Sequence, residues 1–288
     1  MIENKERILK HIFTRKTIRS FIDEKEIPFY GMAKEFFIKE NKTNKEIIEY
    51  FYNILKTKYR NEYFYKNTLL NSLLTKNNTA ITELPIYKSK ADFILIDRDI
   101  IIYEIKTELD NLSRLKSQIE DYYKISKKVV VLSYEENIEN IKKEVPKSVG
   151  IDILKDDKII NIRKPVEYTE KLDKEIMFKV LRKYEFQNVI KEHYDFLPKV
   201  SDFEYYSECL RLFKDIPLNI SYNLFVEQLK NRGNEESLDS IPYELKFLIY
   251  FMKLSEEEKE KLIVFLNKAW QFYFKWYNIF RIETKGEK

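Results

Sequence analysis

The chain has 288 residues, 44% of them hydrophobic, which is enough for one large globular domain or two smaller ones. With 52 basic and 48 acidic residues, the formal net charge of +4 permits nucleic-acid binding through local patches but does not by itself predict it. The single cysteine, Cys209, excludes an intrachain disulfide, and two histidines are too few for a Cys/His zinc site.

Residues 1–58 are predicted to form a helical N-terminal region. An apolar stripe at helical spacing follows a predicted cap at Thr43 or Asn44. The first ten residues are charged and lack the apolar segment of a secretory signal, so we expect a cytoplasmic protein.

Residues 59–165 mix helices and strands and are predicted to form an α/β core. The predicted elements, in chain order, are a helix over 60–76, a strand over 79–87, a hairpin over 90–106, a helix over 109–126, a buried strand over 127–133 and a hairpin around Asp156 and Asp157. Pro85 favours an edge position for the first strand. The strand–helix–strand order predicts parallel pairing through a right-handed crossover.

Residues 166–288 are predicted to form a helical C-terminal domain. The apolar segment Leu262–Phe280 contains lysines and asparagines, and a capping box at Ser255 and Glu258 precedes it, so we expect no membrane span. We interpret this segment as a buried helix, with a homo-oligomer interface through the C-terminal helices as the alternative.

The hairpin over 90–106 carries charges among apolar residues. A turn centred on Arg98 places Asp92 opposite Glu104, and the alternation of a strand puts Lys106 on the same face. Two carboxylates at cross-strand positions repel each other unless a cation lies between them. Asp92, Glu104 and the backbone carbonyl of Ile105 therefore predict a site for Mg²⁺ or Mn²⁺, with Lys106 placed to act on a water or a phosphate.

Other residues extend this candidate site. Gln118 and Tyr122 stand four residues apart on one face of the following helix, and Arg114 extends that stripe by a turn. Glu62, early in the helix before the sheet, is a candidate for a further metal ligand, whereas we interpret Glu83 as a surface residue. The alternative for the hairpin is that its carboxylates are strand-end residues in solvent and that Lys106 is a plain ion-pair partner.

The combined pattern resembles the PD-(D/E)XK nuclease superfamily, in its RecB/Cas4-like branch. Asp92 matches the first acidic position, Glu104-Ile105-Lys106 matches E-x-K, and Gln118 to Tyr122 matches the Q-x3-Y motif. Glu62 stands where many members carry a glutamate in their first helix. The resemblance covers residues 59–165, and it implies a restriction-endonuclease-like core, a mixed sheet flanked by helices, between helical N- and C-terminal regions. The cysteine ligands of an iron–sulfur cluster, found in some members, are missing.

The resemblance implies metal-dependent hydrolysis of phosphodiester bonds. Asp92 and Glu104 would be metal ligands, Lys106 the catalytic lysine, and Gln118 and Tyr122 further catalytic-site residues. DNA is favoured over RNA as substrate, and defence against phage or mobile elements is the expected setting. The alternative is a binding module for nucleic acid or protein, built on a nuclease fold without turnover.

Overall fold

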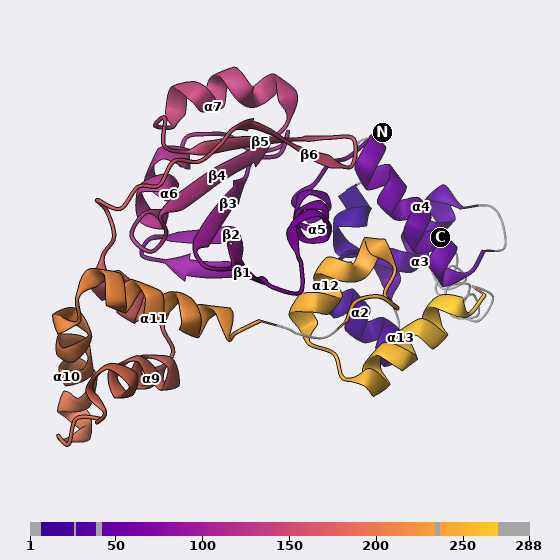
Figure 1. Ribbon diagram of the computed structural model, residues 1–288. Helices are drawn as coiled ribbons and strands as arrows, with labels where there is room; N and C mark the ends of the chain where they lie inside the picture. Colours follow the sequence, from indigo (N-terminus) through magenta and orange to yellow (C-terminus); the bar gives the residue numbers. More distant parts are fainter. Residues whose placement is uncertain (1–6, 26, 39–41, 234–236, 270–288) are drawn as a thin grey trace, which may run out of the picture. The chain divides into compact units, whose positions relative to one another are not determined.

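The structure is a computed structural model that describes residues 7–25, 27–38, 42–233 and 237–269. The chain divides into two compact units. The first contains the described residues of Met1–Asn67 and Glu236–Lys288, and the second is the continuous stretch Thr68–Glu235. Figure 1 shows the elements of both units. The predicted division into three segments follows the order of the chain, whereas the first unit joins helices from both of its ends.

The first unit is helical. Its elements are η1 (Arg7–His11), α2 (Arg15–Ile22), α3 (Pro28–Phe37), α4 (Asn44–Thr57), the start of α5 (Glu62–Leu73), η3 (Tyr243–Leu245), α12 (Lys246–Met252) and α13 (Glu256–Asn267). Thr43 and Glu46 form a capping box at the start of α4, and the predicted box of Ser255 and Glu258 starts α13. Each box satisfies N–H groups that the first helical turn leaves without a partner.

Two buried asparagines tie the helices of this first unit together. The amide of Asn44 accepts from the Tyr30 hydroxyl at 2.8 Å and donates to the Phe265 carbonyl at 2.9 Å. The amide of Asn67 donates to the Tyr52 hydroxyl at 2.8 Å and accepts from a backbone N–H of α12 at 3.0 Å. These contacts cross-link segments that lie far apart in the sequence.

The second unit is built on a six-stranded mixed sheet with the strand order β1-β2-β3-β4-β5-β6. The strands are β1 (Thr79–Ile86), β2 (Ser89–Ile96), β3 (Ile100–Ile105), β4 (Lys128–Ser133), β5 (Gly150–Lys155) and β6 (Lys158–Arg163). β4 pairs in parallel with β3 and with β5, and the remaining pairs are antiparallel. The mixed α/β fold class is confirmed, as are the buried parallel strand β4 and the edge position of Pro85 in β1.

The register of the β2–β3 hairpin is the predicted one. Phe93 pairs with Tyr103, and Ile96 pairs with Ile100 at the start of the turn. The residue numbers of each pair add up to the same value, as a turn centred on Arg98 requires. The face that carries Ile94 and Ile102 is therefore also the face of Asp92 and Glu104.

The helices of the second unit are the end of α5, α6 (Leu115–Tyr122), η2 (Glu135–Asn137), α7 (Ile138–Glu144), α8 (Lys174–Val180), α9 (Lys183–Tyr194), α10 (Asp202–Asp215) and α11 (Leu218–Lys230). α7 is absent from the predicted order, although the parallel pair β4 and β5 needs such a crossover. α8 and α9 are separate helices, because the backbone is extended at Leu181 and Arg182.

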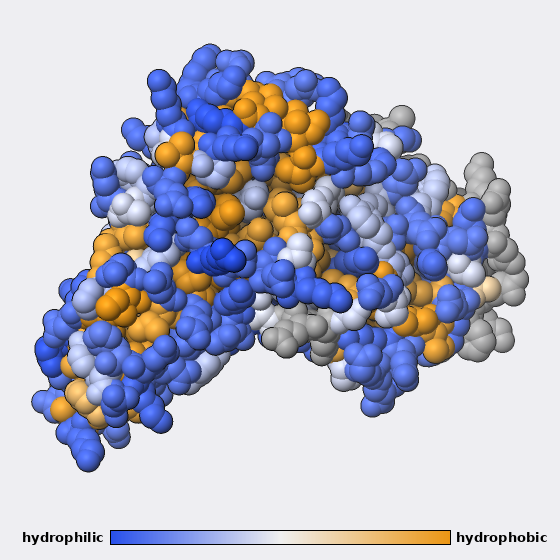
Figure 2. Space-filling model, in the orientation of Figure 1, coloured by the Kyte–Doolittle hydropathy of each residue, from blue (hydrophilic) through white to orange (hydrophobic). Residues whose placement is uncertain are grey.

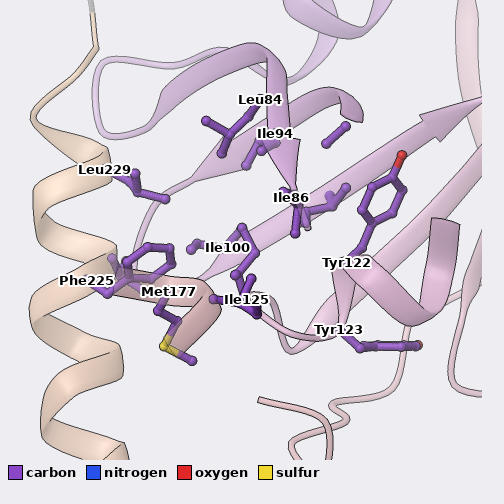
Figure 3. Packing of buried hydrophobic residues seen from close by; sticks show 14 of the residues in the cluster. Leu84, Ile86, Ile94, Ile100, Tyr122, Tyr123, Ile125, Met177, Phe225 and Leu229 are labelled. Atoms are coloured by element: carbon purple, nitrogen blue, oxygen red, sulfur yellow. The ribbon is translucent and has the colours of Figure 1, made fainter. Parts of the chain in front are cut away.

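A hydrophobic core joins one face of the sheet to α6, α8 and α11. Figure 3 shows Ile94 and Ile100 of the sheet near Tyr122 of α6, Met177 of α8 and Phe225 of α11. All five side chains are buried. This packing fixes α6 against the sheet, so that the helix face carrying Gln118 and Tyr122 is held beside β3.

The surface in Figure 2 is largely hydrophilic, with apolar residues interspersed over the helices α9 to α11. Among the described residues, no helix combines the length and the apolar character that crossing a membrane requires. α13 ends at Asn267, so the predicted helix Leu262–Phe280 is not continuous. Its part from residue 270 onward, with the predicted oligomer interface, lies outside the described residues.

Candidate functional site

The candidate site is centred on a buried ion pair at the end of β3. Glu104 and Lys106 are 1% and 8% exposed, and the Lys106 Nζ donates to Glu104 Oε1 at 2.7 Å. The alternative that places both carboxylates of the hairpin in solvent is wrong for Glu104, which is buried, whereas Asp92 is partly exposed and the ion pair of Lys106 is present. A buried pair of this kind has lost its hydration and depends on its hydrogen bonds for compensation.

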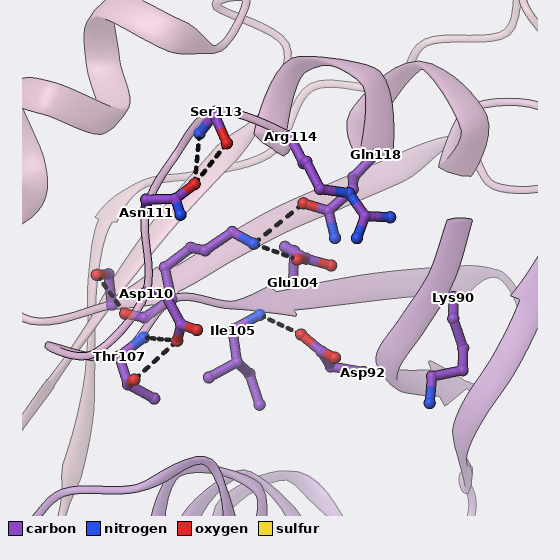
Figure 4. Close-up of polar contacts among 12 residues, drawn as sticks. Lys90, Asp92, Glu104, Ile105, Thr107, Asp110, Asn111, Ser113, Arg114 and Gln118 are labelled. Carbon is purple, nitrogen blue, oxygen red and sulfur yellow. Dashed lines mark hydrogen bonds and ion pairs between the residues drawn. The ribbon is translucent and has the colours of Figure 1, made fainter. Parts of the chain in front are cut away.

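The helix α6 supplies two of these hydrogen bonds, as its spacing predicts. The Lys106 Nζ also donates to Gln118 Oε1 at 3.0 Å, and the Tyr122 hydroxyl donates to Glu104 Oε2 at 2.5 Å. Figure 4 shows Gln118 and Glu104 converging on the lysine ammonium. Among the residues that the structure describes, the ammonium donates to these two oxygens, which leaves one N–H for another acceptor.

Asp92 lies beside this cluster at the start of the hairpin. Its Oδ2 accepts from the backbone N–H of Ile105 at 2.8 Å, and its own carbonyl accepts from the Thr82 hydroxyl at 2.7 Å. The carboxylate of Asp92 is partly exposed, unlike that of Glu104. The predicted repulsion between the two carboxylates is thus relieved by different donors: a backbone N–H for Asp92, and Lys106 with Tyr122 for Glu104.

Glu83, interpreted from the sequence as a surface residue, is exposed but lies next to Asp92. The β1–β2 register pairs Thr82 with Phe93 and Leu84 with Ala91, which places Glu83 opposite Asp92. A carboxylate oxygen of Glu83 lies within 4.8 Å of one of Asp92. Its backbone is left-handed, with φ of 58° inside a strand, and the side chain forms an ion pair with Lys90. The cross-strand register of β1 was the signal that could have found it.

Further contacts hold α6 in register with β2. The Ser89 hydroxyl donates to Asp121 Oδ2 at 2.8 Å, and the Tyr122 hydroxyl lies 3.0 Å from the Lys90 carbonyl oxygen. On the other side, the Ser133 hydroxyl of β4 donates to the Lys106 carbonyl at 2.6 Å. The backbone on both sides of the ion pair is therefore fixed by hydrogen bonds, a condition for a precise site.

The electrostatics of the site act on the Tyr122 hydroxyl. Burial raises its pKa, and the neighbouring carboxylate of Glu104 raises it further, because a phenolate there would face a like charge. Tyr122 is therefore a neutral donor throughout the physiological range. In the structure its hydroxyl donates to Glu104 and so fixes the orientation of that carboxylate.

Three predicted residues take less central places. Arg114 precedes α6 as its N-terminal flanking residue and is exposed, and Figure 4 shows it beside Gln118. Glu62 belongs to the first unit, where it begins α5 and forms an ion pair with Lys66. Ile105 is placed by its N–H, and a ligand role for its carbonyl stays a prediction, as does that of Glu62.

The donor atoms of this site suit a hard divalent cation. Carboxylate and carbonyl oxygens are the ligands that Mg²⁺ and Mn²⁺ prefer, and the site offers the carboxylates of Asp92 and Glu104, with Glu83 beside them. An ammonium next to carboxylates can also stabilise negative charge on a phosphate. The arrangement thus brings oxygen ligands of the type that hard cations prefer and an ammonium to one end of the sheet.

Comparisons with known proteins give one family. The sequence model of a family described as bacteriophage P4 protein cII matches residues 55–241, more than half of the chain. No curated protein matches the chain. A solved structure of a protein of unknown function from Silicibacter pomeroyi is 11% identical, with 46% of this chain and 90% of that chain covered and a TM-score of 0.31. That likeness is too slight to bear on the fold or the function. The chain belongs to the family of bacteriophage P4 protein cII.

Proposed function

We propose that the chain is a metal-dependent nuclease that hydrolyses phosphodiester bonds, with DNA favoured over RNA. The observation that carries the proposal is the buried Glu104–Lys106 pair, joined to Gln118 and Tyr122 and adjacent to Asp92. These five residues come from β2, β3 and α6 and meet at one end of the sheet. Their proximity supports the resemblance to PD-(D/E)XK nucleases, which rests on the same five residues.

The energetics of the pair also favour a role in chemistry. A buried ion pair is weak evidence for stability, because apolar residues of similar size often serve as well or better. Glu104 and Lys106 lie at a strand end within an otherwise apolar hairpin, where isoleucines already supply the packing. Charged residues that break a local apolar pattern in this way are typical of functional sites.

The cation would be held by Asp92 and Glu104, with the Ile105 carbonyl as a predicted additional ligand. When bound, Mg²⁺ or Mn²⁺ supplies a Lewis acid that polarises a phosphoryl oxygen and lowers the pKa of a water. Lys106 directs its remaining N–H toward the phosphate or the attacking water. Gln118 fixes the ammonium from the opposite side, and Tyr122 fixes the carboxylate of Glu104.

The test is cleavage by the purified chain of single-stranded DNA, duplex DNA and RNA with Mn²⁺ or Mg²⁺. Asp92→Asn and Glu104→Gln should each lower the rate at least about 100-fold, because each removes a charged ligand. Asp156→Asn, in the β5–β6 turn, is the matched control and should cleave like the unaltered chain. Cleavage that persists in both site variants would refute the mechanism.

A specific observation favours the second candidate function, a binding module without turnover. Both oxygens of Glu104 already accept hydrogen bonds, from Lys106 and from Tyr122, so the cluster is complete without a metal. Titration with Mn²⁺ followed by calorimetry separates the two. A nuclease binds Mn²⁺ in a manner that Asp92→Asn weakens, and a module of the second kind binds nucleic acid with no such dependence.

The expected setting, defence against phage or mobile elements, is part of the proposal. The family takes its description from a protein of a bacteriophage, so relatives of this chain occur in phage biology. Survival of cells that produce the chain or its Asp92→Asn variant, challenged with phage, tests this setting. Equal plaque counts for the two would contradict it.

A further inference from the structure

The β1–β2 hairpin closes with the two-residue turn Tyr87-Lys88, in which tyrosine occupies an unfavourable backbone position. Tyr87 has a φ of 55°, a left-handed conformation that bulky residues rarely adopt, and its side chain is 57% exposed. Gly, Asn or Asp would satisfy such a turn without strain. The turn itself therefore gives no reason for a tyrosine.

A second hairpin of the same sheet has a turn with a similar backbone and a different residue type. The β5–β6 turn, Asp156-Asp157, has the same left-handed backbone at its first residue, with φ of 55° at Asp156, which tolerates it well. The two turns are thus alike in backbone but differ in side chain. Backbone strain kept at an exposed aromatic residue is a reason to look for a function of its ring.

The surroundings of the ring are positively charged. The ammonium of Lys124 lies 4.3 Å from the Tyr87 ring centroid, and that of Lys88 lies 5.3 Å from it. Lys124 is itself held by Asp121 at 2.8 Å, and Asp121 also accepts from Ser89 in the hairpin. The Lys124 ammonium is thus anchored over the ring, and Lys88 adds a second ammonium from the exposed turn.

An exposed aromatic ring with flanking ammonium groups matches the chemistry of single-stranded nucleic acid. Bases stack on aromatic rings whatever their sequence, and ammonium groups neutralise the phosphates between them. A duplex keeps its bases stacked internally and offers none to such a ring. The combination favours single strands over duplexes and over other polyanions.

The turn is connected to the candidate site by the strand β2. Lys90 has an exposed side chain, its carbonyl oxygen lies 3.0 Å from the Tyr122 hydroxyl, and Asp92 follows two residues later. At about 3.3 Å per residue, the three steps along β2 from Ser89, next to the turn, to Asp92 span about 10 Å, or about three phosphates of one DNA strand.

We propose that Tyr87, Lys88 and Lys124, here called the hairpin-tip site, bind single-stranded nucleic acid and direct it along β2 to Asp92 and Glu104. The path to these carboxylates rests on the proposed nuclease function. Binding at the hairpin-tip site does not require cleavage.

The test uses the full chain with EDTA and a fluorescein-labelled oligothymidylate of 20 nucleotides, followed by fluorescence anisotropy. Tyr87→Asn should weaken binding about tenfold, because one stacked base is lost. The same variant should keep or raise its Tm, because asparagine suits a left-handed turn. Tyr184→Asn, an exposed tyrosine on α9, is the matched control and should leave affinity unchanged.

The lysine gives a second, independent readout. Lys88→Gln should lower the slope of log Kd against log salt by about one, as the loss of a single phosphate contact requires. Lys88→Arg keeps the charge and should keep the slope. An unchanged slope in Lys88→Gln would count against the hairpin-tip site.

The remaining outcomes are decisive in other ways. Unchanged affinity of Tyr87→Asn, or a large fall in its Tm, would overturn the proposal in favour of a purely structural tyrosine. An equal loss of affinity for a labelled poly-glutamate would also overturn it, by showing a general polyanion site. If Tyr87→Asn weakens binding but the chain cleaves no substrate, the nuclease function alone is refuted. If Tyr87→Asn leaves the rate of cleavage unchanged, the hairpin-tip site alone is refuted.

Discussion

Two buried ion pairs of the second unit have similar burial and different surroundings. Glu185 of α9 and Arg232 after α11 meet through two hydrogen bonds, at 2.7 and 2.5 Å, and Arg232 also donates to the Val180 carbonyl. Their side chains are 1% and 8% exposed. The Glu104–Lys106 pair is joined by one hydrogen bond and completed by neutral partners.

Under the proposed function, this difference separates a structural pair from a catalytic one. The guanidinium of Arg232 matches the carboxylate of Glu185 with a planar fork. The Glu185 carboxylate also accepts from the Arg182 backbone N–H, which completes its hydrogen bonding. The ammonium of Lys106 is a point charge that donates to Glu104 and Gln118, and a second carboxylate, that of Asp92, accepts from the N–H of the preceding residue, Ile105. The two pairs are alike in burial and differ in the arrangement of their hydrogen bonds, and the proposal rests on that arrangement.

The largest expected effect is on activity. Lys106→Met should lower the rate of cleavage with Mn²⁺ by about 10²–10³-fold, because it removes a donor aimed at developing charge. Lys106→Arg keeps the charge with a different geometry and should restore folding more than it restores the rate. Initial rates compared with thermal unfolding for both variants measure this. Full activity of Lys106→Met would show that the Glu104–Lys106 pair, like the Glu185–Arg232 pair, has a structural role.

The counterpart is Arg232→Met, which should lower the free energy of unfolding by about 3–5 kcal/mol, because Glu185 stays buried without its cation. Urea denaturation measures the loss, and cleavage per folded molecule should not change. The double variant Glu185→Leu with Arg232→Met should recover most of the stability. A loss below about 1 kcal/mol would contradict the buried pair.

Tyr122→Phe probes a residue that contacts the Glu104–Lys106 pair without belonging to it. Removing the hydroxyl that holds Glu104 should lower the rate about 10–100-fold and raise the Mn²⁺ concentration needed for half-maximal rate. Tyr194→Phe is the matched control, since that hydroxyl donates only to the Leu212 carbonyl among its described hydrogen bonds. If Tyr122→Phe changes the stability of the chain but not the Mn²⁺ dependence of the rate, the role of Tyr122 is structural.

The smallest effect concerns pH. Burial tends to raise the pKa of Glu185, but Arg232 and the Arg182 N–H outweigh it and leave the pKa below its usual value. A lowered pKa stabilises the folded state above the pKa of the unfolded chain, and this stabilisation is lost as pH falls through the folded pKa. Glu185→Gln should therefore flatten the fall of urea-measured stability in acid. An unchanged pH profile would argue against the contribution of Glu185.

Much of the site followed from sequence because it depends on local periodicity. The two-residue alternation of β2 and β3 and a short turn at Arg98 fix which residues share a face with Glu104. The helical repeat then places Gln118 and Tyr122 together. In both cases the chain separation is short and the geometry is regular.

The remaining features depend on contacts that periodicity does not encode. The approach of Glu83 to Asp92 requires the β1–β2 register, and Pro85 in that strand had suggested only an edge position. The Glu185–Arg232 pair links residues 47 positions apart, through helices whose packing angle no pattern specifies. α7 was missed because its seven residues offer too few turns for a clear apolar stripe.

The continuity of the second unit has a consequence for how the chain is made. Residues Thr68–Glu235 form one uninterrupted segment, whereas the first unit needs α2 and α13 from opposite ends of the described chain. During synthesis on the ribosome, every strand of the sheet and its covering helices emerge before α13 exists. The candidate site can therefore assemble while the first unit is still incomplete. The early helices of that first unit, whose apolar faces are not yet covered, would then be the segment that chaperones bind.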